Sequence, residues 1–355
     1  MKRCISALAL GLMLILAIAG CGSSGDTSSS GASPAAEKVT ISFVSWGGVY
    51  QDAEQKAWID SFMVANPNIT VVQDGPTDYA KIKAMVESGN VTWDVVDVQK
   101  DFGVGDSEKF CEKLDPAVIP MSELQPDLLT TTGFRAPVMI ASDVIAYRTD
   151  KFGGNKPTSF ADYFDLKKFP GKRGAYNWAS GSLLEEALLA DGVQPADLYP
   201  LDTDRAFRKL DTIKSSLVWW DTGAQSAQLL VDGEVAMGMS WNGRITDAQK
   251  TGAPIEIMWQ QHFVEPDSLI IPKGSKHVAE ATKLIAWITA AQNNAELSKY
   301  IAYAPSNVNA IAAVSPEVAP SLSTAHLDSA LKFDDVWWGA NWDKVNAEWQ
   351  AWVQK

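Results

Sequence analysis

The chain contains 355 residues, more than one hydrophobic core usually supports, so we expect two lobes. It carries 43 acidic side chains against 30 Lys and Arg, a formal net charge of −13, and this acidity argues against nucleic acid and anionic lipid as partners. Because Cys4 and Cys21 belong to the N-terminal segment described next, Cys111 has no partner for an internal disulfide, and a buried, inert thiol is expected.

The first 21 residues combine two basic side chains with an apolar run at 7–19 that ends in Ile18-Ala19-Gly20-Cys21. This pattern resembles a bacterial lipoprotein signal peptide at 1–21, in which the cysteine becomes the lipidated first residue, and an uncleaved membrane helix is the alternative. Residues 22–37 are rich in Ser and Gly and predict a flexible tether. The resemblance implies an extracytoplasmic protein that acyl chains on Cys21 hold to the membrane, in the periplasmic space or on the outer face of the cytoplasmic membrane.

After residue 38 the apolar pattern alternates between that of strands and that of helices. In chain order the first expected elements are a strand at 39–45, a helix that begins at 53 and ends at Asn66-Pro67, a strand at 69–73, a helix at 79–88 and a strand at 93–98. This βαβ repetition predicts a parallel, doubly wound sheet with helices on both faces. In such open sheets ligands bind beyond the carboxyl ends of the strands, where this chain has Trp46, Gly47-Gly48 and residues 99–102.

The rest of the chain continues the α/β pattern. Its expected strands are 138–147, 235–240, 255–259 and 266–272, and its expected helices are 183–190, 206–214 and 279–291. Near the carboxyl end one stripe of apolar side chains recurs at helical spacing: Trp338, Trp342, Val345, Trp349 and Trp352. Such a stripe usually docks a terminal helix on the body, so we expect packing here rather than a carbohydrate-binding surface.

Motifs of catalysis and of metal binding are missing from the sequence. It has no HExxH, no paired Cys ligands, no GxSxG and no P-loop, and its three histidines lie apart without ligand spacing. Nothing in this pattern nominates a nucleophile or a general base. The sequence therefore predicts a protein that is not an enzyme and that needs no metal or other cofactor, with a surface lipoprotein hydrolase as the alternative.

Several short motifs share the order and spacing of one family. They are SWGGVYQDA at 45–53, WDVVDV at 93–98, KFPGKR at 168–173, DGEV at 232–235 with WNGR at 241–244, and DSLIIP at 267–272. Together these stretches resemble the spermidine/putrescine-type solute-binding proteins of ABC importers. The resemblance implies an α/β, two-lobed periplasmic-binding-protein-like fold of type II, with mixed doubly wound sheets, a hinge and an interlobe cleft.

Boundaries near Ala141 and Pro266 would divide this fold. Lobe 1 would comprise 38–141 plus 267–312, and lobe 2 would comprise 142–266 plus 313–355. The resemblance also implies a monomer that captures a small cationic solute, putrescine or spermidine, closes by hinge motion and delivers the solute to a permease in the membrane.

In that family the methylene chain of the ligand lies between aromatic rings and its ammonium groups meet carboxylates, which suits the physics of a polyamine. Four positions match this pattern: Trp46, Trp241, Asp267 and Tyr303. Glu265 stands where polyamine binders often have a second tryptophan, and Asp101 stands where they have a tyrosine. Both changes exchange a ring for a carboxylate, so all six residues are expected ligand contacts.

Other departures keep the identity of the solute open. The acidic pair usual before the first long helix of the second lobe appears here as Ala179 and Ser182, with Glu185 and Glu186 close in sequence. An opine, a sugar or an organic acid is therefore the alternative solute in the same transport role. An arginine that meets the ligand would indicate an anionic group on that ligand. The candidate arginines are Arg135, Arg148 and Arg244.

Overall fold

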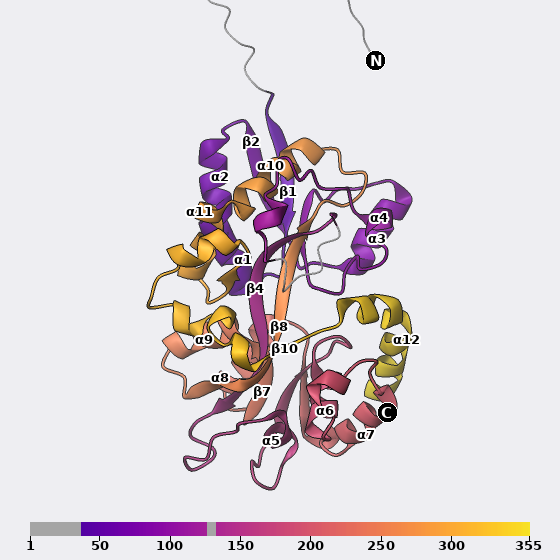
Figure 1. The fold of residues 1–355 in the computed structure, drawn as a ribbon, viewed down its shortest axis with the longest axis vertical. Coiled ribbons are helices and arrows are strands. Elements are labelled where there is room, and N and C mark those ends of the chain that lie inside the picture. Colours follow the sequence, from indigo (N-terminus) through magenta and orange to yellow (C-terminus); the bar gives the residue numbers. More distant parts are fainter. Residues whose placement is uncertain (1–36, 126–132) are drawn as a thin grey trace, which may run out of the picture. The chain divides into compact units, whose positions relative to one another are not determined.

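The computed structural model describes residues 37–125 and 133–355 (Figure 1). The expected signal peptide, its lipidation site Cys21 and the tether up to residue 36 lie outside these ranges. In the part of the chain that is described, no helix has both the length and the apolar character needed to cross a membrane.

A mixed sheet of ten strands forms the centre of the described chain, which confirms the expected α/β class. Its main path runs β2-β1-β3-β8-β4-β7-β5-β6, while β10 pairs with β8 and β9 pairs with β4. The strands are β1 (Val39–Val44), β2 (Ile69–Asp74), β3 (Val95–Val98), β4 (Ala136–Arg148), β5 (Arg173–Tyr176), β6 (Leu217–Trp220), β7 (Met237–Trp241), β8 (Ile255–Ile270), β9 (Ala304–Pro305) and β10 (Ala330–Lys332). The parallel pairing expected from the βαβ pattern holds for β1 with β2 and β3, but β3 pairs antiparallel with β8.

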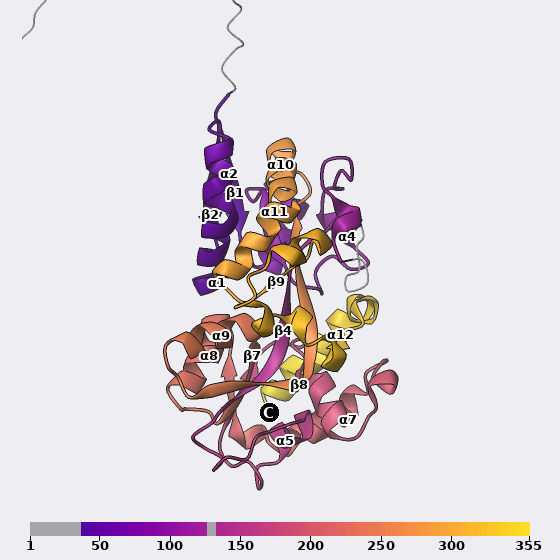
Figure 2. The same cartoon turned by 60° about the vertical axis from the view of Figure 1, so that its left-hand side comes forward.

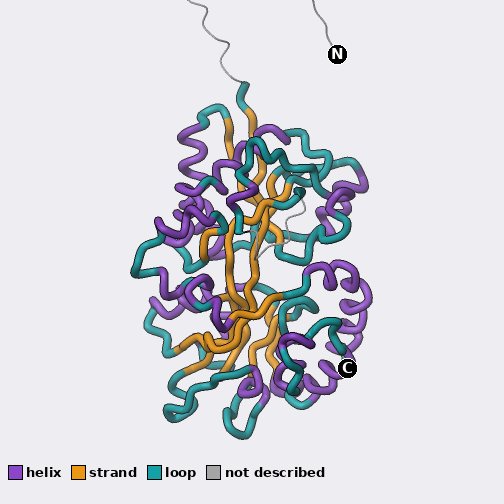
Figure 3. Tube along the Cα trace, in the orientation of Figure 1, coloured by secondary structure: helices purple, strands orange, loops and turns teal. Residues whose placement is uncertain are grey.

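Two long antiparallel strands, β4 and β8, run side by side through the middle of the sheet (Figure 3). The sequence pattern predicts two separate strands at 255–259 and 266–272, and this prediction is wrong because β8 is continuous over 16 residues. The residues between the two expected strands pair with β4, from Ala141 opposite Glu265 to Val144 opposite His262. Pairing with a distant strand leaves no mark in the local pattern, so sequence periodicity cannot reveal it.

Helices flank this sheet (Figures 1 and 2). They are α1 (Gly48–Glu54), which continues through a π-helical stretch (Gln55–Ile59) into α2 (Asp60–Ala65), then α3 (Tyr79–Ser88), α4 (Ser107–Phe110), α5 (Phe160–Phe164), α6 (Leu183–Ala190), α7 (Thr203–Asp211), α8 (Gly223–Val231), α9 (Asn242–Lys250), α10 (Val278–Thr289), α11 (Ala291–Asn294) and α12 (Asp335–Val353). Short 3-10 turns lie at 121–123, 195–197, 214–216, 295–299, 308–313, 319–321, 323–325 and 327–329.

Helix α3 has the bounds that the sequence predicts, because both of its ends carry a local signal. Its first turn is capped by the Asp78 side chain, which accepts a hydrogen bond from the backbone N–H of Lys81. Its end is set by Gly89, whose positive φ of 69° stops the helix at little steric cost. The helix therefore follows strand β2 with a fixed start, and this start borders the cavity described below.

The buried apolar side chains form separate clusters. One cluster draws on residues between 145 and 263 and on α12, and another draws on residues between 41 and 141 and between 269 and 303. The expected packing of the carboxyl-terminal stripe is confirmed, since Trp338, Val345 and Trp349 are at most 1% exposed. Cys111 is a free, buried cysteine, as expected, and burial raises the pKa of its thiol to about 12, which favours the unreactive thiol form.

Candidate functional site

A cavity of about 510 Å³ lies at the carboxyl ends of several strands. Trp46 enters it after β1, Gln99 after β3, Trp178 after β5 and Trp241 at the end of β7. This is the edge where open α/β sheets bind ligands. Four of the six expected ligand contacts line the cavity: Trp46, Trp241, Asp267 and Tyr303.

Aromatic rings form much of the cavity wall, and their mutual contacts hold them in place. The rings in the lining are Trp46, Tyr50, Tyr79, Tyr176, Trp178, Trp241 and Tyr303. The ring of Tyr176 stacks on Trp220 at 4.3 Å between ring centres and meets Trp241 edge-on at 5.4 Å. Tyr50 meets Tyr303 edge-on at 5.3 Å. Rings fixed in this way present apolar faces that suit a short methylene chain and a cation.

Asp267 places a carboxyl group in the wall of the cavity. It lies near the end of β8 and is 4% exposed. Burial, together with the nearby carboxylates of Asp97 and Glu265, raises the pKa of Asp267 well above its ordinary value. An ammonium group placed beside it would favour its charged form and pair with it, so this part of the lining suits a cation.

Behind Asp267 lies a second buried acidic residue, Asp97 of β3. Its two oxygens accept hydrogen bonds from Tyr50 Oη at 2.7 Å and from Trp46 Nε1 at 3.4 Å. Burial raises the pKa of Asp97 to about 7. Glu54 of α1 is buried beside it, and burial together with the charge of Asp97 raises the pKa of Glu54 well above its ordinary value. Asp97 therefore fixes two rings of the cavity wall, and burial of Asp97 and Glu54 favours their neutral, protonated forms in the ligand-free protein.

Arg244 brings a positive charge to the same cavity. It lies in the first turn of α9 and is 5% exposed. Its Nη2 donates to the carbonyl oxygen of Gly47 at 3.2 Å, while Nε and Nη1 are buried without a hydrogen-bond partner among the described residues. Gly223 leaves room for this group, because a Cβ there would lie 2.8 Å from Arg244 Nε. Free guanidinium donors beside a cavity suit a carboxylate.

The other two candidate arginines have partners elsewhere. Arg135 donates to the carbonyl oxygens of Gln99 and Lys100, and Arg148 donates to Asp150 and to carbonyl oxygens at the end of α8. Neither of them lines the cavity. Arg244 is therefore the one of the three that could meet a ligand there.

Glu265 and Asp101, the two remaining expected contacts, lie outside the lining. Glu265 Oε1 lies 2.7 Å from Lys100 Nζ, and Glu265 Oε2 accepts from Trp241 Nε1 at 2.6 Å. Burial favours the neutral acid, but the ammonium of Lys100 together with hydrogen bonds to the carboxylate, among them that of Trp241, holds the pKa of Glu265 below its ordinary value. The Glu265 carboxylate is therefore already neutralised within the protein.

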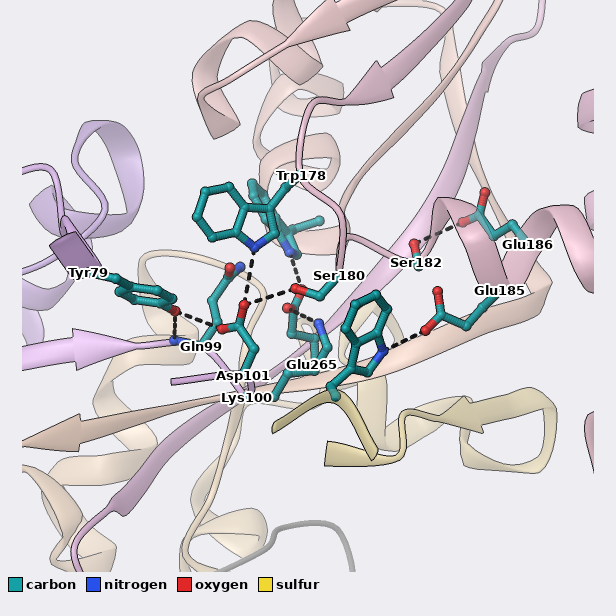
Figure 4. Close-up of polar contacts among 12 residues, drawn as sticks. Tyr79, Gln99, Lys100, Asp101, Trp178, Ser180, Ser182, Glu185, Glu186 and Glu265 are labelled. Atoms are coloured by element: carbon teal, nitrogen blue, oxygen red, sulfur yellow. Dashed lines mark hydrogen bonds and ion pairs between the residues drawn. The ribbon is translucent and has the colours of Figure 1, made fainter. Parts of the chain in front are cut away.

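Asp101 is likewise used inside the protein (Figure 4). Its Oδ1 accepts from Tyr79 Oη at 2.9 Å, and its Oδ2 accepts from Trp178 Nε1 at 3.1 Å and from Ser180 Oγ at 2.9 Å. These bonds join the loop after β3 to the loop after β5. Asp101 therefore fixes two rings of the cavity wall instead of facing the cavity.

The acidic residues near the start of α6 also point elsewhere (Figure 4). Glu185 accepts from Tyr199 and Trp338, and Glu186 accepts from Ser182. Both glutamates are fully buried and neither lines the cavity. They do not replace the acidic pair that the resemblance would place there.

The sequence reasoning missed four rings of the lining: Tyr50, Tyr79, Tyr176 and Trp178. Tyr50 falls inside the motif at 45–53, and Tyr79 opens a correctly predicted helix, so both were within reach of the pattern. Tyr176 and Trp178 belong to β5 and the loop after it, and no local sequence pattern predicts this strand. Among the residues that the structure describes, no group of three or more His, Cys, Asp or Glu could hold a metal ion.

Comparison with known proteins gives consistent matches. A family model described as bacterial extracellular solute-binding protein matches residues 57–324. The γ-aminobutyric acid-binding protein of Pseudomonas aeruginosa is 34% identical over 329 residues, which cover 90% of this chain and 92% of that protein. The solved structure of the Atu4243–GABA receptor superposes with a TM-score of 0.82 at 44% identity, covering 88% of this chain and 97% of that one. The spermidine/putrescine-binding periplasmic protein 1 of Haemophilus influenzae is 27% identical over 259 residues, 70% of this chain and 71% of that protein.

Proposed function

The chain belongs to the bacterial extracellular solute-binding protein family and is the solute-binding component of an ABC transporter, and we propose that its solute is a short ω-amino acid of the γ-aminobutyrate type. The family resemblance of the sequence motifs is confirmed by these matches. As a member of this family the protein binds its solute and releases it unchanged, so it is not an enzyme.

One observation carries the choice of solute: Arg244 and Asp267 line the same cavity. A guanidinium with unpartnered donors suits a carboxylate, and a buried carboxylate suits an ammonium. Aromatic rings form the wall of the cavity and suit the methylene groups of a short chain. A molecule with an acid at one end, an amine at the other and methylene groups between them satisfies all three features.

A polyamine fits this lining less well. A dication needs a second carboxylate, and the two expected for that role, Glu265 and Asp101, already have partners within the protein. The other carboxylates of the lining, Asp78 and Asp221, are exposed, so water screens their charge. A polyamine would also bring an ammonium close to the guanidinium of Arg244. The names of the Pseudomonas aeruginosa protein and of the solved receptor, which both refer to γ-aminobutyrate, support the amino acid instead.

The two-lobed division remains our proposal, with lobe 1 at 38–141 plus 267–312 and lobe 2 at 142–266 plus 313–355. The separate apolar clusters support it, since one includes the first half of β4 and the end of β8, and the other includes the end of β4 and the first half of β8. Contacts also run between the proposed lobes: Arg244 donates to the carbonyl oxygen of Gly47, and Asp101 accepts from Trp178. Such contacts would hold the lobes closed around the solute, and hinge motion would separate them.

The place of the protein in the cell completes the proposal. The signal-like segment would direct it out of the cytoplasm, and acyl chains on Cys21 would anchor it to the membrane. There it would act as a monomer, collect the solute and hand it to the membrane permease that an ABC transporter requires. Labelling of cells with a radioactive fatty acid tests the anchor, because Cys21→Ala should abolish incorporation.

Calorimetric titration with four matched ligands tests the proposed solute. γ-Aminobutyrate has both charges, butyrate lacks the ammonium, n-butylamine lacks the carboxylate, and putrescine carries two ammonium groups. We expect γ-aminobutyrate to bind at least about 100-fold more tightly than each of the others, since a tenfold step in Kd corresponds to 1.4 kcal/mol and each lost charge pair costs more than that. Preferential binding of putrescine would refute the proposal and restore the polyamine reading.

Thermal denaturation gives an independent check on the same ligands. A ligand that binds only the folded protein adds about 2.7 kcal/mol of stability at 100 times its Kd. The melting temperature should therefore rise by a few degrees with γ-aminobutyrate and stay unchanged with butyrate.

A further inference from the structure

Lys100 is a buried cation, and Figure 4 shows it beside Glu265. It follows β3, its side chain is 2% exposed, and its Nζ lies 2.7 Å from Glu265 Oε1. The same Nζ lies 3.7 Å from the centre of the Phe333 ring. A buried ammonium must be paired, and here the pairing is made entirely within the chain.

A short chain of contacts connects Lys100 to the cavity. Lys100 bonds to Glu265, and the other oxygen of Glu265 accepts from the indole N–H of Trp241 at 2.6 Å. The ring of Trp241 lines the cavity. One side chain therefore separates the Lys100–Glu265 pair from the space where a ligand would lie.

The strand register shows that this pair continues the acidic side of the cavity. Glu265 and Asp267 are two residues apart on β8, so they project from the same face of the sheet. Their partners on β4 are Ala141 and Met139, which both line the cavity. Asp143, two residues further along β4, extends the same face and is also buried. An acidic row thus begins with Asp267 in the lining and continues to Glu265 and Asp143 outside it.

An acidic row of this kind would accept a second ammonium if it were left unpaired. Asp267 faces the cavity, and Glu265 and Asp143 lie further along the row. One cationic end of a diamine could pair with Asp267 and the other with this second part of the row. Burial and, after it, the negative charge of Glu265 raise the pKa of Asp143, and the ammonium of Lys100 acts in the opposite direction. Lys100 therefore supplies a positive charge where a longer, doubly charged ligand would otherwise supply its own.

We propose that Lys100 is a specificity-determining residue: its ammonium takes the place of the second cationic group of a diamine in the acidic row, and so restricts the cavity to ligands with a single ammonium. This inference rests on the proposed function, since it names the feature that makes an ω-amino acid the solute in place of a diamine. It assigns to Lys100 a role in excluding ligands, beyond the positioning of Trp241.

The variant Lys100→Gln tests the inference. The amide of the new side chain keeps a hydrogen-bond donor for Glu265, so Trp241 stays in position while the positive charge is lost. Calorimetric titration with γ-aminobutyrate and putrescine should show the ratio of the two Kd values shifting toward putrescine by at least about tenfold. Lys100→Arg, which keeps the charge, should retain the wild-type ratio.

A double variant serves as the matched control. Lys100→Gln with Glu265→Gln removes both charges, so the row gains no free carboxylate and the preference for putrescine should disappear again. A folded Lys100→Gln protein with an unchanged ratio, or one that loses affinity for both ligands in equal proportion, would overturn the inference.

The wild-type titration separates this inference from the proposed function. Wild-type protein that binds neither γ-aminobutyrate nor a longer ω-amino acid refutes the proposed function, yet putrescine binding that appears only in Lys100→Gln still supports the role of Lys100. Wild-type protein that binds putrescine as tightly as γ-aminobutyrate overturns the inference directly.

Glu265→Gln provides a second route if Lys100→Gln does not fold. It leaves the Lys100 ammonium without its counter-ion, so ligands with an ammonium should lose affinity and butyrate should not. The affinity for γ-aminobutyrate should fall at least about tenfold relative to that for butyrate. Equal changes for both ligands would overturn the inference.

Discussion

Glu265 and Asp267 are two residues apart on the same strand and face the same way, yet their surroundings differ. Both oxygens of Glu265 have partners within the chain, one in Lys100 and one in Trp241. Asp267 lines the cavity and lies close to other acids, so the pKa of its carboxyl is raised by burial and by Asp97, whereas that of Glu265 is held low by Lys100. The comparison teaches that a carboxylate near a binding cavity is available to a ligand only when the protein has not already neutralised it.

We expect Asp267→Asn to have the largest effect on ligand binding. The substitution keeps the size of the side chain but removes the charge, so the ligand ammonium loses its partner. We expect a loss of about 2 to 5 kcal/mol in the binding of γ-aminobutyrate by calorimetry, the usual cost of truncating one partner of a buried charge pair. Asp221→Asn is the matched control, because Asp221 lines the same cavity but is exposed, and its loss should leave the affinity nearly unchanged. A loss of less than tenfold in Asp267→Asn would refute the assignment.

Arg244→Met should weaken binding from the opposite end of the ligand. Hydrogen bonds to a charged group contribute about 1.5 to 3 kcal/mol each, so we expect the affinity for γ-aminobutyrate to fall by one to two orders of magnitude. Binding of n-butylamine, which has no carboxylate, should change little or improve. If both ligands weakened equally in the titration, Arg244 would be shaping the cavity and not recognising a carboxylate.

Trp241→Phe tests the role of Glu265, whose carboxylate is neutralised within the protein. The ring is kept for the cavity wall, but the indole N–H that Glu265 accepts is lost. Leaving one oxygen of a buried carboxylate unpaired should lower the free energy of unfolding by about 1 to 3 kcal/mol in a urea titration. The affinity for γ-aminobutyrate should fall less than it does in Asp267→Asn. A variant that binds far more weakly but unfolds like the wild type would show that the indole N–H serves the ligand instead.

The stability of the ligand-free protein should depend on pH through the buried acids near Asp267. Burial raises the pKa of Asp97 from 3.8 to about 7, so the folded state holds this proton up to higher pH than the unfolded chain does. Its contribution to stability is therefore present at low pH and is lost as the pH rises through 7. We expect the melting temperature to fall by a few degrees between pH 6 and pH 8, and to fall less in Asp97→Asn. The melting temperature of that variant should still fall as the pH rises, because the pKa values of Glu54 and Asp267 are raised as well.

Local signals account for the elements that the sequence predicts well. Helix α3 has a capping Asp78 and a terminal Gly89, and α6 coincides with the expected 183–190 because its apolar run is clearly bounded. Strands β5 and β6 and helices α8 and α9 were not anticipated. Strand β5 is only four residues long and includes Gly174, so it gains its structure from pairing with β6 and β7.

The residues of the cavity also differ in whether a local motif marks them or only contacts between distant segments place them. Motifs singled out Trp46, Trp241, Asp267 and Tyr303, and the structure brings these four together in one lining. The partners of the two remaining candidates lie far away in the chain: 165 residues separate Lys100 from Glu265, and 77 separate Asp101 from Trp178. Spacing in a sequence carries no information on such pairs.

The sequence by itself determined the class of this protein: an acidic α/β chain with a signal-like start, the motifs of a solute-binding family and no pattern for catalysis. These properties depend on composition, on periodicity and on short stretches of adjacent residues, which can be read directly. Only the tertiary structure decided which charges are available to a ligand. It neutralised Glu265 with Lys100, tied Asp101 to Trp178, and placed Arg244, two of whose nitrogens have no partner among the described residues, in the same cavity lining as Asp267. The pairing of buried charges depends on distances between segments that the fold alone brings together.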